Sequence, residues 1–70
     1  MEKTRKVRTK ILSFKEKNKD IDHDRAEKML NDWIQIHKDI DIISIAKSEA
    51  MFSAKGGIIS ELSIKILYKE

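Results

Sequence analysis

Four side chains have the types and spacing that suit an anionic ligand. Arg8 and Lys10 lie two residues apart near the start of the chain, and Ser63 and Lys65 lie two residues apart near its end. Residues two apart share one face of a strand, and an arginine holds a phosphate or carboxylate by two parallel hydrogen bonds. With the neighbouring Arg5, these residues form the expected ligand-binding set.

The charge distribution defines which partners such a set would suit. The first nineteen residues carry eight Lys or Arg against two Glu, whereas residues 20–41 carry three against seven Asp or Glu. This contrast attracts a small anion or the acidic segment of a second subunit. A net charge of +3 is modest and no aromatic residue is interleaved with the basic ones, which argues against nucleic acid. The competing interpretation is a solvated face that keeps an edge strand soluble.

Patterns for catalysis and metal binding are absent or incomplete. The chain has no cysteine, no Gly-rich phosphate loop and no recognisable arrangement of nucleophile, base and orienting group. Asp20, Asp22 and Asp24 alternate as in a calcium loop, but Arg25 and Asn31 stand where that loop needs Gly and Glu. We therefore expect no enzyme, no cofactor and no metal.

The elements that must position these residues begin with a strand over residues 6–14. Apolar and polar side chains alternate there with the period of two that is typical of a half-buried strand. We expect the odd positions, such as Val7 and Ile11, to face the core. Arg8 and Lys10 would then lie on the open face, beside Ser63 and Lys65.

A helix is predicted over residues 23–37. Its apolar stripe consists of Ala26, Met29, Leu30, Trp33, Ile34 and His37. Either Asp22 or Asp24 caps its start. Asp24 has capping-box spacing to Glu27, whereas a cap at Asp22 would make Ile21 and Ala26 a hydrophobic staple.

Two further strands are predicted over residues 40–48 and 58–68, with residues 48–54 as a continued, poorly paired arm. Gly56-Gly57 supplies the positive φ angles of a tight turn. A two-residue turn there places Ile45 opposite Tyr68, on the core face. A three-residue turn would put Ser44 and Ala46 on that face instead.

Together these elements predict one α+β domain over residues 1–70, a three-stranded antiparallel sheet wrapped on one helix in the order β-α-β-β. Residues 58–68 extend about 36 Å as a strand, whereas a helix of fifteen residues spans about 22 Å. The helix cannot shelter the whole apolar row, so we expect a homo-oligomer. Its predicted interface residues are Trp33, Met51, Phe52 and Tyr68.

The location of the protein is expected to be cytoplasmic. No apolar run approaches the roughly 20 residues of a membrane span. The basic start is not followed by the apolar stretch of a signal peptide. We expect no membrane partner, and a bacterial cytoplasm, or that of the host if the chain is phage-encoded.

The order of a strand, an amphipathic helix, DIDIISIAKS, a Gly turn and a strand ending in SIKILYKE resembles two groups. One is the small sporulation-associated proteins of Gram-positive bacteria and their phages, and the other is the dodecins. The resemblance implies a dodecin-like topology and a multimeric habit. Dodecins stack flavin on a Trp at the start of the second strand. Residues 39–43 lack an aromatic residue and Trp33 lies on the helix, so flavin is not expected.

These observations predict a small non-enzymatic homo-oligomeric binding protein. A more specific hypothesis is that the protein sequesters an anionic nucleotide-type ligand between subunits. The alternative is a protein-interaction module that binds and inhibits a host or sporulation factor. Its exposed apolar strand ends would form the contact, through strand addition or a groove.

Overall fold

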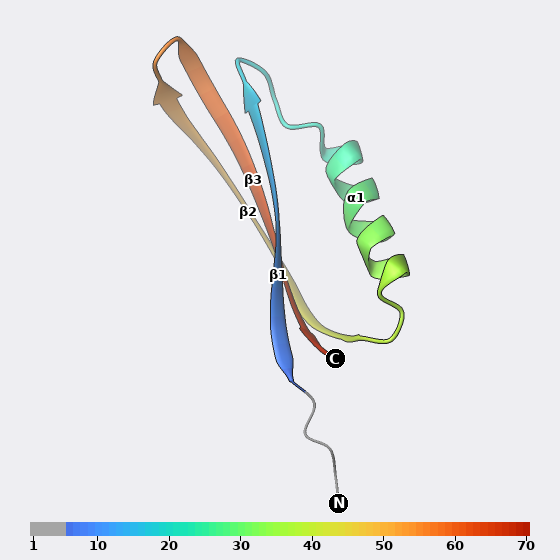
Figure 1. Ribbon diagram of the computed structural model, residues 1–70. Helices are drawn as coiled ribbons and strands as arrows, with labels where there is room; N and C mark the ends of the chain where they lie inside the picture. Colours follow the sequence, from blue (N-terminus) through green and yellow to red (C-terminus); the bar gives the residue numbers. More distant parts are fainter. Residues whose placement is uncertain (1–5) are drawn as a thin grey trace, which may run out of the picture.

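The computed structural model describes residues 6–70, which form one helix and one three-stranded antiparallel sheet. The elements follow the chain as β1 (Val7–Lys17), α1 (His23–Ile36), β2 (Asp41–Ala54) and β3 (Gly57–Lys69) (Figure 1). The strand order is β1-β3-β2, so β3 is central and both β1 and β2 are edge strands. The predicted α+β class with a three-stranded antiparallel sheet is confirmed.

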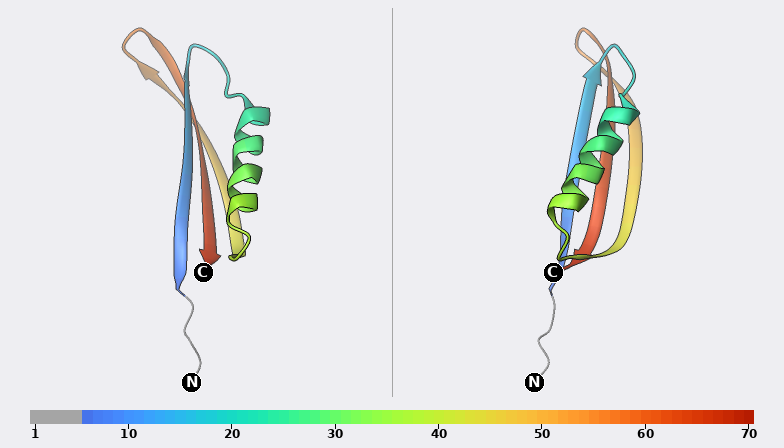
Figure 2. Two further views of the ribbon diagram at one scale, coloured as in Figure 1. Left: turned by 45° about the vertical axis from the view of Figure 1, so that its right-hand side comes forward. Right: turned by 90° about the vertical axis from the view of Figure 1, so that its right-hand side faces the viewer.

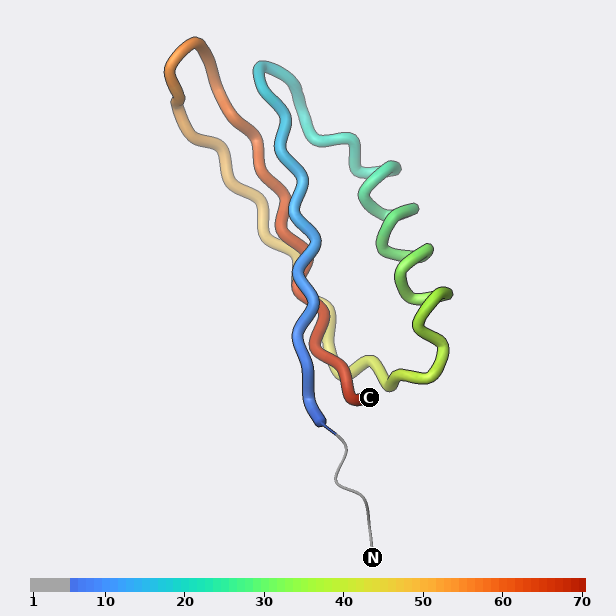
Figure 3. The backbone as a smooth tube through the Cα atoms, in the orientation of Figure 1, coloured from blue at the N-terminus to red at the C-terminus, as the bar shows by residue number. Residues whose placement is uncertain are grey.

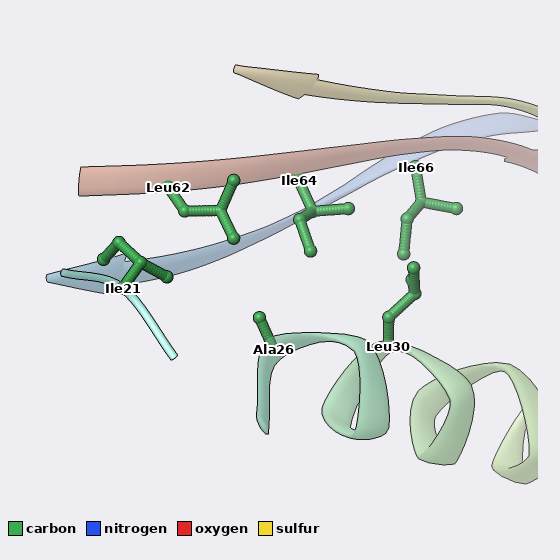
Figure 4. Packing of buried hydrophobic residues seen from close by; sticks show 6 residues of the cluster. All are labelled: Ile21, Ala26, Leu30, Leu62, Ile64 and Ile66. Atoms are coloured by element: carbon green, nitrogen blue, oxygen red, sulfur yellow. The ribbon is translucent and has the colours of Figure 1, made fainter. Parts of the chain in front are cut away.

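The core lies between β3 and α1. Leu62, Ile64 and Ile66 are 2%, 1% and 0% exposed, and they point from β3 toward Ala26 and Leu30 of the helix (Figure 4). Strand alternation puts these three isoleucine and leucine side chains on one face. We call this side of the sheet the helix face and the other side the open face.

The start of α1 decides between the two predicted caps. The Asp22 carboxylate accepts a hydrogen bond from the Arg25 backbone N–H at 3.1 Å, so Asp22 is the N-cap. Ile21 and Ala26 are both buried in the core, as the Asp22 alternative predicted. The helix ends at Ile36, one residue earlier than expected, and His37 follows as its C-cap.

The predicted orientation of β1 is wrong. Leu12 lies opposite Ile64 and Phe14 opposite Leu62, and both pack against the core, so the even positions of β1 share the helix face. Val7 and Ile11, which were expected to face the core, are 54% and 59% exposed. Both sets of β1 positions contain apolar residues, and the register with the buried row of β3 selects the even set.

The strand β1 also runs to Lys17, three residues beyond its predicted end. Lys15, which was assigned to a polar loop, pairs with Glu61 of β3, and their charged groups lie 3.3 Å apart. Asn18 then turns the chain with a φ of 58°. The polar residues of this segment therefore belong to the solvent-exposed end of an edge strand, not to a loop.

The hairpin turn consists of Lys55 and Gly56, one residue earlier than predicted, because Ala54 pairs with Gly57. Gly57 is drawn into β3 beside Asn18, whose side-chain oxygen accepts the Ile58 N–H at 3.0 Å. A Cβ at Gly57 would lie 2.1 Å from that oxygen. Gly57 is therefore required for this close approach rather than for the turn.

The shift of the turn moves the partners in β2 but keeps their faces. Ile45 lies opposite Ile66, not opposite Tyr68, and remains on the helix face as predicted. A register irregularity between Ile42 and Ser44 brings Ile42 opposite Tyr68. Residues 48–54 were expected to form a poorly paired arm, but they are paired with β3 as far as Ala54.

The helix covers only part of the sheet. It lies in front of β1 and β3, while β2 swings out beside it (Figure 2). The tip of the β2–β3 hairpin extends past the start of α1 (Figure 3), and Ile58 near that tip is 48% exposed. In the described part of the chain, no helix is long and apolar enough to span a bilayer.

Candidate functional site

The strand β2 is the most exposed element of the fold. All fourteen of its residues are exposed, although it pairs with β3 along its length. It lies at the edge of the sheet, and α1 does not cover it. An exposed, long edge strand is a ready-made template for pairing with another chain.

The direction of the free backbone groups follows from the pairing. The Asn18 N–H donates to the Ile58 carbonyl, so even-numbered residues of β3 direct their backbone groups toward β1. The odd-numbered residues of β3 therefore form their backbone hydrogen bonds with β2. From Ser44 onward, their partners in β2 are the even-numbered residues. The odd-numbered residues of β2 consequently direct their N–H and C=O groups outward from the sheet.

The outward-directed residues also share the helix face. They are Ile45, Lys47, Glu49, Met51 and Ser53. Ile45 and Met51 are 40% and 68% exposed, and they flank the charged pair Lys47 and Glu49. An apolar–basic–acidic–apolar row thus lies along the uncovered margin of the helix face. We call Ile45, Lys47, Glu49 and Met51 the β2 row.

One contact ties the β2 row to the helix. His23, the first residue of α1, lies 2.5 Å from the Glu49 carboxylate through its Nε2 atom. Both side chains are more than half exposed, so the pair contributes little to stability. It does bring Glu49 into contact with the start of the helix. Within residues 6–70, Lys47 forms no ion pair.

The open face of β2 carries small residues around one aromatic side chain. Ala46, Ser48 and Ala50 occupy successive even positions, and Phe52 follows with 46% exposure. Small side chains on this face leave room for the backbone of another strand to approach. A row of Ser13, Ser63 and Ser48 crosses all three strands there.

The structure separates the predicted ligand-binding residues. Arg8 and Lys10 lie opposite Tyr68 and Ile66, on the helix face, whereas Ser63 and Lys65 lie on the open face. The expectation that these four share the open face is wrong, because it followed from the incorrect orientation of β1. Arg5 lies outside the described residues.

Arg8 and Lys10 instead border an aromatic cluster near the end of α1. The Trp33 ring stacks on His37 at a centroid distance of 4.3 Å and meets the Tyr68 ring edge-on at 5.3 Å. Arg8 lies opposite Tyr68 and places its Nε 2.7 Å from a carboxylate oxygen of Glu70. Basic and aromatic groups thus meet at this end of the helix face.

The four predicted interface residues divide into two pairs. Trp33 and Tyr68 are half-buried and pack against the core of their own chain. Met51 and Phe52 are exposed on opposite faces of β2. Only the second pair is open to a partner without rearrangement of the monomer.

Other chemistry has little support in the described region. Residues 6–70 contain no group of three or more His, Asp or Glu side chains placed to hold a metal ion. An open hollow lies between the start of α1 and β2, and its lining includes His23, Glu49, Met51 and Ser60. Every buried side-chain nitrogen or oxygen in this part of the chain has a hydrogen-bond partner.

Sequence reasoning missed the charged pair in the β2 row. Lys47 and Glu49 were assigned to a strand end and to an ambiguous arm. The signal was present, because Ile45 to Met51 alternate with small residues, Ser44, Ala46, Ser48 and Ala50.

No family model matches the chain, and neither a curated protein nor a solved structure shows significant similarity to it.

Proposed function

We propose that this chain is a small non-catalytic binding protein that self-associates through the outer edge of β2. The observation that carries the proposal is the exposure of all fourteen β2 residues at the edge of the sheet. A dodecin-like multimeric habit and a cytoplasmic location, expected from the sequence, are part of the same proposal.

Energetic considerations support association. A domain of this size buries only about 60% of the surface of its unfolded chain, so its stability margin is small. Small scaffolds add disulfides, metals or oligomerisation, and this chain has no cysteine. A second strand on β2 would bond its free backbone groups and cover Ile45 and Met51, which are 40% and 68% exposed.

The test is the mass in solution, measured by light scattering over a wide range of protein concentration. The proposal predicts particles of at least twice the 8.2 kDa chain mass, with dissociation on dilution. An 8.2 kDa particle at every concentration would overturn it. That result would favour the alternative, an interaction module whose β2 edge accepts a strand of another protein.

A second candidate function is the binding of an anionic, aromatic ligand such as a nucleotide. The observation that favours it is the position of Arg8 opposite Tyr68, whose ring meets that of Trp33, with Lys10 next along the same face of β1. Guanidinium and ammonium groups hold phosphates, and aromatic rings stack on bases. A ligand phosphate at Arg8 would compete with Glu70, which already holds its Nε.

Calorimetry against a panel of nucleotides tests this second function. Arg8→Glu and Lys10→Glu should each abolish binding of any nucleotide that the wild-type chain binds. Lys28→Glu is the matched control, since Lys28 is an exposed helix residue away from the cluster and the variant has the same net charge. Absence of heat with every nucleotide, or equal loss in the control, would refute it.

A further inference from the structure

The β2 row has a pattern that specifies how two copies would pair, an inference that rests on the proposed self-association. Lys47 and Glu49 stand two residues apart, with Ser48 between them and with Ile45 and Met51 on either side. Read in the opposite direction, the row again has a charged pair between two apolar residues. This symmetry suits antiparallel pairing of β2 with β2 of a second copy.

Backbone geometry restricts the registers that such a pair can adopt. Only the odd-numbered residues of β2 direct N–H and C=O groups outward, so they must lie opposite odd-numbered residues of the partner. A register that placed odd opposite even residues would form no regular ladder and would set the two helix faces on opposite sides. The remaining registers are those centred on a single residue of β2.

Charge selects one of these registers. A pair centred on Lys47 sets two lysines opposite each other, and a pair centred on Glu49 sets two glutamates opposite each other. A pair centred on Ser48 sets Lys47 opposite the partner's Glu49 and Glu49 opposite the partner's Lys47. Registers centred on Ala46 or Ala50 leave both charges opposite uncharged residues. Registers that would bring Asp41 opposite either charge must carry the pairing across the irregularity between Ile42 and Ser44.

We propose that two copies of this chain associate by antiparallel pairing of β2 centred on Ser48, with two symmetric Lys47–Glu49 ion pairs. A lone lysine at the centre of an edge strand would block edge-to-edge association. Lys47 followed by Glu49 instead favours the register centred on Ser48 and disfavours the two registers on either side of it. The pair thus acts as a specificity element for a second copy of the same chain.

The other side chains fit this register. On the helix face, Ile45 lies opposite the partner's Met51, and Met51 lies opposite the partner's Ile45. On the open face, Ser48 meets the partner's Ser48 and Ala46 meets the partner's Ala50. The regular stretch provides four hydrogen-bonded pairs, hence about eight new backbone hydrogen bonds.

The assembly would be a continuous six-stranded sheet with both helices on one face. Its two-fold axis is perpendicular to the sheet and passes between the two Ser48 residues. Because each helix lies over β1 and β3, the paired β2 strands form the floor of a groove between the helices. The His23 contact leaves the second oxygen of Glu49 available for the partner's Lys47.

Single cysteines report the register directly, because the chain has no native cysteine. Opposed residues of a non-hydrogen-bonded pair have Cα atoms about 4.5 Å apart, within the range of a disulfide. Ser48→Cys should therefore form a covalent dimer on mild oxidation. Ala50→Cys should not, since the two copies of that position lie about 13 Å apart along the strands. Cross-linking of Ala50→Cys but not Ser48→Cys would overturn the proposed register.

Charge exchange provides the second test. Lys47→Glu or Glu49→Lys should each weaken association about tenfold or more, because like charges then face each other. The double variant K47E/E49K should self-associate as the wild type does and fail to mix with it. His23→Ala controls for loss of the helix contact in the Glu49 variant.

The outcomes separate this inference from the proposed function. A wild-type chain that is monomeric at every concentration refutes both. A wild-type oligomer whose affinity is unchanged by Lys47→Glu and Glu49→Lys refutes the Ser48-centred register but leaves self-association standing. Mixed dimers between wild-type and doubly exchanged chains, formed as readily as homodimers, would likewise overturn the register.

Discussion

Single residues of β3 hold the small core together. Ile66 is 0% exposed and lies opposite Lys10 and Ile45 in the centre of the sheet. Ile66→Val removes one buried methyl group and should lower the free energy of unfolding by about 0.5–1.5 kcal/mol. Denaturant titration at fixed protein concentration measures this change. Ile36→Val is the control, because Ile36 is 77% exposed, and an equal effect there would contradict the assigned core.

The helix cap is the second feature that depends on one residue. Asp22 accepts the Arg25 N–H at 3.1 Å, so Asp22→Ala should destabilise the chain by about 0.5–2 kcal/mol. Asp24→Ala removes a first-turn charge with no cap bond and should cost less, about 0.3–1 kcal/mol. Thermal unfolding of both variants measures which substitution destabilises the chain more. A larger loss for Asp24→Ala would show that the helix begins later.

At the scale of elements, the two faces of β1 differ in burial. Leu12 packs against the core, whereas its neighbour Ile11 is 59% exposed on the open face. Leu12→Asn should therefore lower the free energy of unfolding by about 1–3 kcal/mol. Ile11→Asn, a matched change one residue away, should alter it by about 0.5 kcal/mol or less. The reverse order would mean that β1 pairs in the other register.

The sequence predicted every element, and its errors have identifiable physical causes. In β1, Val7 and Ile11 alternate with Leu12 and Phe14, so both faces carry apolar residues and alternation alone cannot choose between them. The choice depends on long-range pairing with Leu62 and Ile64. Elements with one apolar face, such as β3 and α1, were oriented correctly because local pattern and tertiary packing agree there.

The candidate sites show the same dependence on non-local pairing. Because the predicted orientation of β1 was wrong, Arg8 and Lys10 were expected on the open face together with Ser63 and Lys65. The turn was misplaced by one residue because Gly57 has a role that involves Asn18, distant in sequence. The β2 row became apparent only when the strand order left β2 at an edge.

At the scale of the whole molecule, one short helix faces a longer sheet. The fourteen residues of α1 span about 21 Å, whereas the fourteen residues of β2 span about 46 Å. The helix therefore shelters the middle of β3 and parts of β1, and it leaves β2 with Ile45, Met51 and Phe52 exposed. Self-association is the physical consequence that we propose for this mismatch.

Hydrogen exchange at the β2 backbone tests that claim most directly. The amides of Ile45, Lys47, Glu49 and Met51 point outward, and residues 6–70 offer them no partner strand. At concentrations where the protein is assembled, we predict that these four amides exchange as slowly as those of Ala46 and Ser48, which bond to β3, and that dilution restores fast exchange. Fast exchange of the four outward amides at every concentration, beside protected neighbours, would contradict the pairing of β2 with a second copy.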